Sequence, residues 1–279
     1  MTSKPNNKRK TLKRGILFFA LACAASGFFA CASPVSLGSF GEARAPTVGT
    51  PQLVVMTYNV NYGMSGDEAT LALIEASDAH ILFLQETTPE WQAAIEERVR
   101  ERFPYQVWRD PSGGWAAGGG AILSHWPLRE VETSPSAADW FEAIGAVVES
   151  PFGEVRVAGV HLEPASSLTA ALQVSGHHED EMEAHIRALH LDGEGPTIIA
   201  GDFNEERAGA LRLLESMGFV DATGDYHPGV PTFEWHLRFT TLELQLDHIL
   251  HRGLDSLDAQ VLQGGRSDHQ PVRATFRFR

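Results

Sequence analysis

The chain alternates between short apolar runs and longer polar stretches in which apolar residues recur every three or four positions. The apolar runs at 53–59, 80–86 and 198–200 are bounded by turn residues, a pattern typical of buried strands. The first two runs end in Asn59 and Glu86, and Asp202 and Asn204 follow the third. Further strands are expected at 105–109, 119–124, 141–150, 154–161, 232–235, 246–250 and 272–278.

Helical spacing predicts helices between several of these strands. The first is expected over 67–76 and the second from Pro89 in its first turn to about residue 102. A longer helix is expected over 168–189, interrupted at Gly176, and another over 206–217. Many strands with interspersed helices indicate a layered α/β or α+β domain.

The N-terminal segment has the pattern of an export signal. A basic head is followed by an apolar run at 16–30 that is short for a membrane span, and small residues close it. One interpretation of this segment is a lipoprotein signal that is cleaved before Cys31, with Cys31 lipidated. Cleavage after Ala32 and retention as an uncleaved anchor are the alternatives. We expect a signal peptide at 1–31, a flexible linker at 32–51 and one domain at 52–279.

This organisation predicts an exported protein, either a membrane-anchored lipoprotein or a periplasmic or extracellular one. Membrane contact is expected only through an anchor at Cys31, and no stable protein partner is predicted. Cys23 and Cys31 are the only cysteines, so a mature chain that begins at Cys31 or Ser33 has no internal disulfide or zinc–thiolate site.

Charge narrows the range of partners. The chain has 22 Lys and Arg against 36 Asp and Glu. Six of the cations lie in the basic head, which leaves 16 against 36, a net charge of −20, and no lysine follows Lys13. Such a surface repels polyanions and disfavours tight binding of duplex DNA. A nuclease that uses divalent cations and a few arginines remains open.

Polar, chemically capable residues follow several of the apolar strands. If these strand ends meet at one edge of packed sheets, they form a cleft of carboxylates, histidines and amides. Mostly oxygen donors favour Mg²⁺, with Mn²⁺ or Ca²⁺ as alternatives, and this set suits metal-assisted attack of water on a phosphoester. A role for Asp202 in capping the next helix is the simpler alternative. The residues are Asn59, Glu86, His161, Asp202, Asn204, Asp247, Asp268 and His269.

An ordered set of short motifs resembles the endonuclease/exonuclease/phosphatase superfamily, which has the deoxyribonuclease-I-like fold. The resemblance spans essentially residues 53–278 and implies a four-layer α/β/β/α sandwich with the site at one edge. The motifs are Thr57-Tyr58-Asn59-Val60-Asn61, Leu84-Gln85-Glu86, Gly120-Ala121-Ile122-Leu123-Ser124, Val160-His161-Leu162, Gly201-Asp202-Phe203-Asn204, Leu246-Asp247-His248-Ile249 and Ser267-Asp268-His269.

The resemblance also implies a role for each motif residue. Glu86 would be the principal metal ligand, with Asn59 and possibly Asn61 beside it and Asp268 as a further ligand. Asp202 and Asn204 would orient the attacking water and the phosphate. His269 would act as base or phosphate contact, oriented by Asp247, and His161 would stabilise the pentavalent phosphorus or protonate the leaving oxygen. Either Asp202 or His269 would take the proton of the water.

The chain departs from the family pattern in two places. His248 stands where relatives often have an aromatic residue, and no loss is expected from it. The helix before Asp202 lacks the arginine that many relatives have there.

Residues outside the motifs receive simpler interpretations. Arg266 and Arg238 are the candidates for a phosphate contact. Residues 177–181, which include two histidines and three acidic residues, are expected to form a solvated helix face. Five further histidines are expected at the surface or at edges, and three tryptophans near the site loops: His80, His125, His190, His227 and His251, then Trp115, Trp126 and Trp235.

The sequence therefore favours an exported phosphoesterase that cleaves a P–O bond. Nuclease or phosphodiesterase action on nucleic acid competes with action on lipid headgroups or sugar phosphates. A non-catalytic surface lipoprotein of the same fold is the alternative from another class. The presence of every expected polar residue favours the enzyme.

Overall fold

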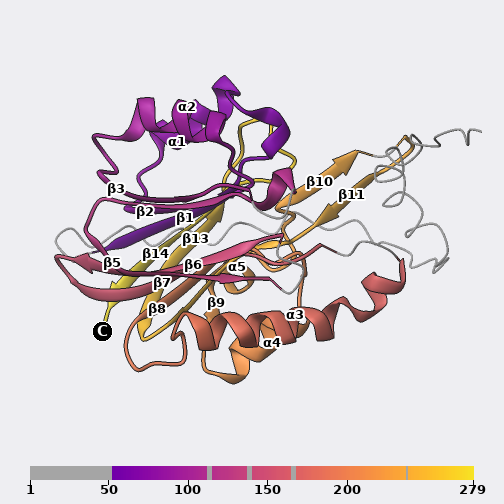
Figure 1. The fold of residues 1–279 in the computed structure, drawn as a ribbon. Helices are drawn as coiled ribbons and strands as arrows, with labels where there is room; N and C mark the ends of the chain where they lie inside the picture. Colours follow the sequence, from indigo (N-terminus) through magenta and orange to yellow (C-terminus); the bar gives the residue numbers. More distant parts are fainter. Residues whose placement is uncertain (1–51, 112–114, 137–139, 165–167, 237) are drawn as a thin grey trace, which may run out of the picture.

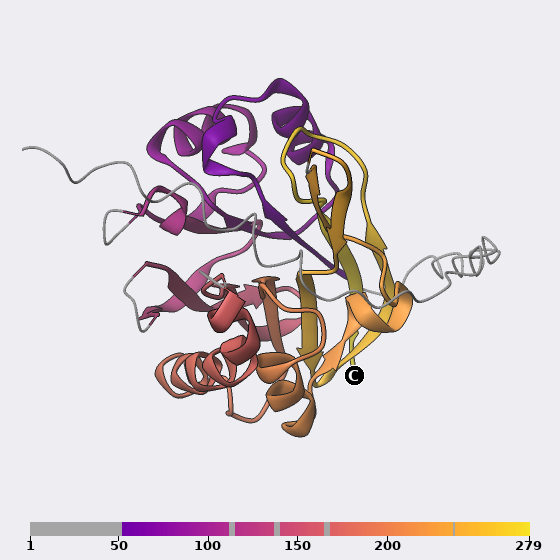
Figure 2. The same ribbon diagram turned by 90° about the vertical axis from the view of Figure 1, so that its right-hand side faces the viewer.

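The computed structural model describes residues 52–111, 115–136, 140–164, 168–236 and 238–279, with the backbone alone for 168–175. Two six-stranded sheets pack face to face, and helices cover the outer face of each sheet (Figures 1 and 2). A separate two-stranded hairpin, β10–β11, projects from one end of the sheets (Figure 1). The expected four-layer α/β/β/α sandwich is confirmed.

The first sheet has the strand order β13-β14-β1-β2-β4-β3. Its central strands β1 and β2 are parallel, and all other neighbours are antiparallel. The elements of this half are β1 Leu53–Asn59, η2 Tyr62–Met64, α1 Glu68–Ala76, β2 Ile81–Gln85, α2 Pro89–Val99, β3 Tyr105–Arg109, η3 Ala116–Gly118, β4 Gly120–Ser124, β13 Leu254–Val261 and β14 Val272–Phe278.

The second sheet has the strand order β5-β6-β7-β8-β12-β9, with β7 and β8 parallel. None of the helices among the described residues has the length and apolar character needed to span a membrane. The remaining elements are β5 Leu128–Pro135, β6 Glu142–Ser150, β7 Gly153–His161, α3 Leu168–Ala188, β8 Thr197–Asp202, α4 Gly209–Ser216, β9 Val220–Asp221, α5 Ala222–Tyr226, β10 Phe233–His236, β11 Thr241–Leu244 and β12 Asp247–Arg252.

Both faces of the central strands are buried, which explains their continuous apolar sequences. In β1, Leu53 and Val55 face the core between the two sheets, whereas Met56 and Tyr58 pack in the cluster under α1 and α2. In β8, Ile199 packs in the corresponding cluster under α3 and α4. One apolar cluster lies between the two sheets and one lies under the helices on each outer face, and together they fix how the sheets pack on each other.

Strand register brings the polar strand ends to a single edge. Asn59 pairs with Gln85 at the ends of the parallel strands β1 and β2, one residue before Glu86. His161 pairs with Asp202 at the ends of β7 and β8, and Asp247 pairs with Asp202 across β8 and β12. The parallel strands of each pair end at the same edge of their sheet, and the antiparallel strand β12 begins at that edge with Asp247. These residues therefore come together through strand register alone.

The differences from the expected elements have physical reasons. Strands β5 and β13 were not expected, because as sheet edges they carry polar residues that are exposed in β5 and half-buried in β13, and both lack an apolar run. The short elements β9, α5 and β11 were also not expected. Helix α3 continues through Gly176, contrary to the expected interruption. Met182 and Ile186 of α3 and Leu189 directly after it are buried, and their burial contributes more than the cost of about 1 kcal/mol for a helical glycine.

Gly201 permits the close approach of β7 and β8 directly before Asp202. A Cβ atom at Gly201 would lie 1.9 Å from the backbone oxygen of Val160, and the residue has a φ of 155°. We expect Gly201→Ala to destabilise the fold by about 3 kcal/mol or more, because neither strand backbone can move without disrupting the sheet. Thermal or urea unfolding measures this loss.

Gly176→Ala is the matched control, because the position is helical and a Cβ there meets no atom within 4 Å. It should leave stability unchanged or raise it by up to about 1 kcal/mol. Equal stability of the Gly201→Ala and wild-type proteins would contradict the steric argument.

Candidate active site

Asn59 connects the two sheets at the centre of the site. Its side chain is fully buried, and Nδ2 donates to Oε1 of Glu86 and to Oδ2 of Asp202, each at 3.1 Å. Its Oδ1 accepts the backbone N–H of Asn61 at 3.1 Å. One amide therefore holds a carboxylate from each sheet in place. This geometry confirms that Asn59, Glu86 and Asp202 meet, as the sequence predicted.

Glu86 is a partly buried carboxylate held by neutral donors rather than by a cationic side chain. Its oxygens accept from two neutral donors, Asn59 Nδ2 and the backbone N–H of Tyr62, both at 3.1 Å. Burial, assisted by the nearby charge of Asp268, raises the pKa of Glu86 to about 7. The residue also adopts a left-handed φ of 57°, which costs roughly 1 kcal/mol for a non-glycine residue. Strain and burial of this kind typically accompany a functional role.

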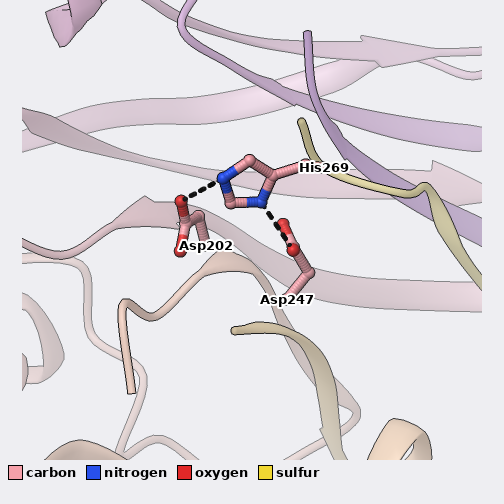
Figure 3. A group of neighbouring side chains, drawn as sticks. All are labelled: Asp202, Asp247 and His269. Atoms are coloured by element: carbon pink, nitrogen blue, oxygen red, sulfur yellow. Dashed lines mark hydrogen bonds and ion pairs between the residues drawn. The ribbon is translucent and has the colours of Figure 1, made fainter. Parts of the chain in front are cut away.

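His269 and Asp247 form a hydrogen-bonded pair beside Asp202 (Figure 3). Nδ1 of His269 lies 2.8 Å from Oδ2 of Asp247, and Nε2 lies 3.6 Å from Oδ2 of Asp202. Burial opposes a charge on the imidazole, but the carboxylates of Asp247 and Asp202 outweigh burial and raise the pKa of His269 to about 10. Asp247 is itself fixed by its backbone N–H, which donates to Oγ1 of Thr232 at 2.9 Å.

His161 faces Asp202 from the other side. Its Nε2 lies 3.6 Å from Oδ2 of Asp202, and its ring packs against Phe141 with the centroids 4.1 Å apart. Burial lowers the pKa of His161 to about 4. The site therefore pairs one neutral and one protonated imidazole around a single carboxylate oxygen.

Asn204 and Asp268 complete the predicted set. The backbone N–H of Asn204 donates to Oδ1 of Asp202 at 2.9 Å, and its Nδ2 donates to the backbone oxygen of Leu162 at 2.8 Å. Asp268 accepts from Nδ2 of Asn61 at 2.8 Å. Asp202 does not cap the helix that follows, because α4 has Ala208 at its N-cap position without a side-chain cap.

The donor set fits a hard divalent cation. Glu86 forms no ion pair with an arginine among the described residues, and its neighbour Asp268 supplies further carboxylate oxygens, the ligands that Mg²⁺ prefers. Asn59 turns Nδ2 toward Glu86, and its Oδ1 accepts from Asn61, so a ligand role for Asn59 stays a prediction. A second group is formed by Asp202, Asp247 and His269, whose ligand atoms lie within 4.8 Å of one another. In that group Nδ1 of His269 already contacts Asp247, whereas the oxygens of Glu86 accept only from neutral donors.

The two predicted phosphate-binding arginines do not join this cluster. Arg266 has a side chain that is 73% exposed, and its guanidinium lies 3.9 Å from Asp67. Arg238 stacks over Phe239 at 5.1 Å near the tip of the β10–β11 hairpin. Neither guanidinium contacts a site carboxylate in the described part of the chain. A phosphate role for either residue stays a prediction.

Three expectations outside the motifs are wrong. Residues 177–181 are not a wholly solvated face, because His178 and Glu181 are buried and only His177, Glu179 and Asp180 are exposed. His251 is 3% exposed and lies inside β12 rather than at the surface. Trp126 follows the end of β4 that lies away from the site. The polarity of His178, Glu181 and His251 concealed their burial.

The other predicted surface residues divide as follows. His190 is exposed, while His80, His125 and His227 are half-buried. Trp115 is 42% exposed and stacks on Trp140 at 4.9 Å, joining the β3–β4 and β5–β6 connections.

Sequence reasoning missed Thr232, which fixes Asp247. A lone threonine before a short strand gives no signal for such a role.

The matching family model and the fold agree on the class of protein. The model described as "Endonuclease/Exonuclease/phosphatase family" matches residues 56–269, so the chain belongs to this family. It is also 27% identical to a UPF0294 protein of Erwinia tasmaniensis over 252 residues, covering 86% of this chain and 87% of that one. A UPF0294 protein of Yersinia enterocolitica is 27% identical over 257 residues, covering 88% and 91%.

Solved structures share the fold at lower identity. An endonuclease/exonuclease/phosphatase from Beutenbergia cavernae has a TM-score of 0.66 at 17% identity, covering 81% of this chain and 72% of that one. The 3'-5' exonuclease NExo of Neisseria meningitidis has a TM-score of 0.60 at 21% identity, covering 81% and 100%. The human Nocturnin catalytic domain, solved with a bound sulfate anion, has a TM-score of 0.63 at 19% identity, covering 82% and 94%.

Proposed function

We propose that the protein is a divalent-metal-dependent phosphoesterase that hydrolyses a P–O bond by in-line attack of water, most plausibly as a nuclease or phosphodiesterase. The observation that carries this proposal is the bridge by Asn59 between Glu86 and Asp202, with the His269–Asp247 pair beside it. A buried acidic pocket without a balancing arginine, next to an imidazolium, suits a cation and a phosphate monoanion or dianion.

Glu86 and Asp268 would hold the cation, for which Mg²⁺ is the first choice and Mn²⁺ or Ca²⁺ the alternatives. When bound, the cation supplies positive charge that polarises the phosphoryl oxygens. The backbone N–H of Tyr62 and Nδ2 of Asn59 orient the Glu86 carboxylate toward that position. The amide of Asn61 does the same for Asp268.

The remaining residues act on the water and the phosphate. Because the pKa of His269 is raised to about 10, its imidazole is protonated at neutral pH and can neutralise a phosphate oxygen through Nε2. Asp202 is then the group that accepts the proton of the attacking water. His161 stays neutral at pH 7, and Asn204 keeps the Asp202 carboxylate oriented through its backbone N–H.

Action on a small phosphate ester or a lipid headgroup is the second candidate. The net charge of −20 beyond the basic head favours it, because the acidic chain repels a long polyanion. Nuclease action has the support of the similar fold of the Neisseria 3'-5' exonuclease. The two candidates use the same site residues and differ only in what binds beyond the scissile phosphate.

A substrate panel with metal control tests the proposal. The protein would be stripped with EDTA and assayed on single-stranded and duplex DNA, bis-p-nitrophenyl phosphate, an inositol phosphate and sphingomyelin vesicles. We expect hydrolysis of at least one substrate, a loss of about a hundredfold or more on chelation, and recovery with Mg²⁺ or Mn²⁺. Hydrolysis that persists undiminished in EDTA would contradict the metal dependence. Inactivity on the whole panel would favour the non-catalytic lipoprotein.

A further inference from the structure

Glu205 forms a buried turn directly after the site residues Asp202 and Asn204. Only 5% of the residue is exposed. One carboxylate oxygen, Oε1, accepts the backbone N–H of Leu211 in the first turn of α4 at 2.8 Å. The other, Oε2, lies 3.0 Å from Nδ1 of His178 on α3. The backbone after the site is therefore held by a side chain from a helix that has no role in the chemistry.

His178 connects the two strand ends that carry His161 and Asp202. Its ring is fully buried, and Nε2 lies 2.8 Å from the backbone oxygen of Glu163. A carbonyl oxygen only accepts hydrogen bonds, so Nε2 must carry a proton. The contact with Glu205 then needs a second proton between Nδ1 and the carboxylate. Burial opposes this charge, but the contacts with Glu205 and Glu163 outweigh it and raise the pKa of His178.

His248 holds the same turn from the opposite side. It follows Asp247 and is fully buried in β12. Its Nδ1 lies 2.8 Å from Oδ2 of Asp221, and its Nε2 lies 3.2 Å from the backbone oxygen of Gln245 and 3.3 Å from that of Glu205, so one N–H is shared between two carbonyl groups. Both nitrogens again face acceptors, so this imidazole also donates twice. The two histidines reach Glu205 through different atoms, one through the carboxylate and the other through the carbonyl.

We propose that His178 and His248 are positioning residues that clamp the Glu205 turn and thereby fix Asp202 and Asn204 in the catalytic site. The inference rests on the proposed phosphoesterase function. Asn204 has a left-handed φ of 50°, and its Nδ2 bonds to Leu162 on the loop that His178 also holds. Such a backbone conformation persists only where surrounding contacts determine it. A loosened turn would displace the Asp202 carboxylate relative to both site imidazoles.

The hydrogen bonds themselves, rather than buried charge, are expected to matter. In Glu205→Gln, the amide NH₂ can donate to a neutral His178 at Nδ1 while its oxygen still accepts from Leu211. The hydrogen bond from His178 to Glu163 is then unchanged. This variant should keep kcat within about threefold of wild type. His178→Leu removes both donors, and we expect it to lower kcat by about 10- to 100-fold with KM changed by less than about threefold.

His178→Gln and His251→Leu complete the series. His178→Gln keeps only one good donor and should give an intermediate loss of kcat. It is also expected to fold if His178→Leu does not. His251→Leu removes a buried histidine of β12 whose ring nitrogens have no hydrogen-bond partner in the described structure. It can change stability, but it should leave kcat unchanged because the residue lies away from the turn.

Amide hydrogen exchange gives a readout that does not require activity. Exchange at residues 203–205 should be at least about tenfold faster in His178→Gln than in wild type, and unchanged in Glu205→Gln. Wild-type kcat together with wild-type exchange in His178→Gln would overturn the clamp. If the wild-type protein hydrolyses no substrate, the proposed function fails, but faster exchange at the turn would still support the positioning role.

Discussion

Glu86→Gln is expected to lower kcat by at least about two orders of magnitude, because it removes the anionic ligand that we assign to the cation. Glu86→Ala should cause a similar loss. The carboxamide keeps the shape of the side chain, and its oxygen can still accept from the backbone N–H of Tyr62, although its NH₂ cannot accept from Nδ2 of Asn59. Steady-state assays at saturating Mg²⁺ measure the effect. Near-wild-type turnover in either variant would remove Glu86 from the mechanism.

The same variant should stabilise the metal-free protein at alkaline pH. The pKa of Glu86 in the folded state, about 7, is raised above its ordinary value. Between the ordinary pKa of 4.5 and about pH 7, the folded protein therefore binds more protons than the unfolded chain. The free energy of unfolding falls as pH rises through this range. At pH 8 in EDTA, Glu86→Gln should be more stable than wild type by about 3 kcal/mol. At pH 5, where Glu86 is protonated, the difference should largely disappear.

Added Mg²⁺ should reverse this order at pH 8. Binding to the folded state raises the melting temperature of the wild-type protein, whereas Glu86→Gln should respond little. Protons compete with the cation for the Glu86 carboxylate, so the Mg²⁺ concentration needed for half-maximal stabilisation of wild type should rise as pH falls from 8 to 6. An equal shift in melting temperature for both proteins would place the cation elsewhere.

His269→Ala is expected to reduce kcat by at least about two orders of magnitude, since it removes the protonated donor next to Asp202. Asp247→Asn should show a smaller loss, of about tenfold or more, because the imidazole keeps a hydrogen-bond partner but loses the carboxylate that holds its proton. Both are measured as kcat with the melting temperature recorded in parallel.

His190→Ala is the matched control for this pair. His190 also lies near a carboxylate, with Nε2 3.9 Å from Oε1 of Glu132, but its side chain is 66% exposed. Exposed pairs of this kind contribute little, so activity and stability should remain close to wild type. Full activity of folded His269→Ala would exclude the imidazole from the reaction.

The proposed reaction requires local positive charge in a strongly acidic chain. The half-buried carboxylates of Glu86 and Asp268 lie close enough for the charge of Asp268 to add to the effect of burial on the pKa of Glu86, and a cation between them would remove that repulsion. The protonated imidazole of His269 adds positive charge 3.6 Å from Oδ2 of Asp202. In the proposed mechanism, the positive charge that faces the phosphate therefore comes from the cation and from His269 rather than from basic residues on the surface.

The sequence by itself determined the fold class and the membership of the site. Strands buried on both faces, such as β1 and β8, appear as continuous apolar runs, and each ends in a residue capable of chemistry. The order of the motifs indicated which strand ends belong together, and Asn59, Glu86, Asp202 and His269 do meet. Local patterns suffice here, because burial and strand period are properties of short segments.

Only the tertiary structure decided which polar residues are buried. His178, Glu181 and His251 read as surface residues, because a polar side chain gives no sequence signal of the partner that makes its burial tolerable. The edge strands β5 and β13 escaped prediction for a related reason, since their stability depends on one neighbouring strand rather than on an apolar run. The partners of His178, at Glu163 and Glu205, are 15 and 27 residues away in the chain. Contacts at such separations depend on strand register and helix packing, which no local pattern specifies.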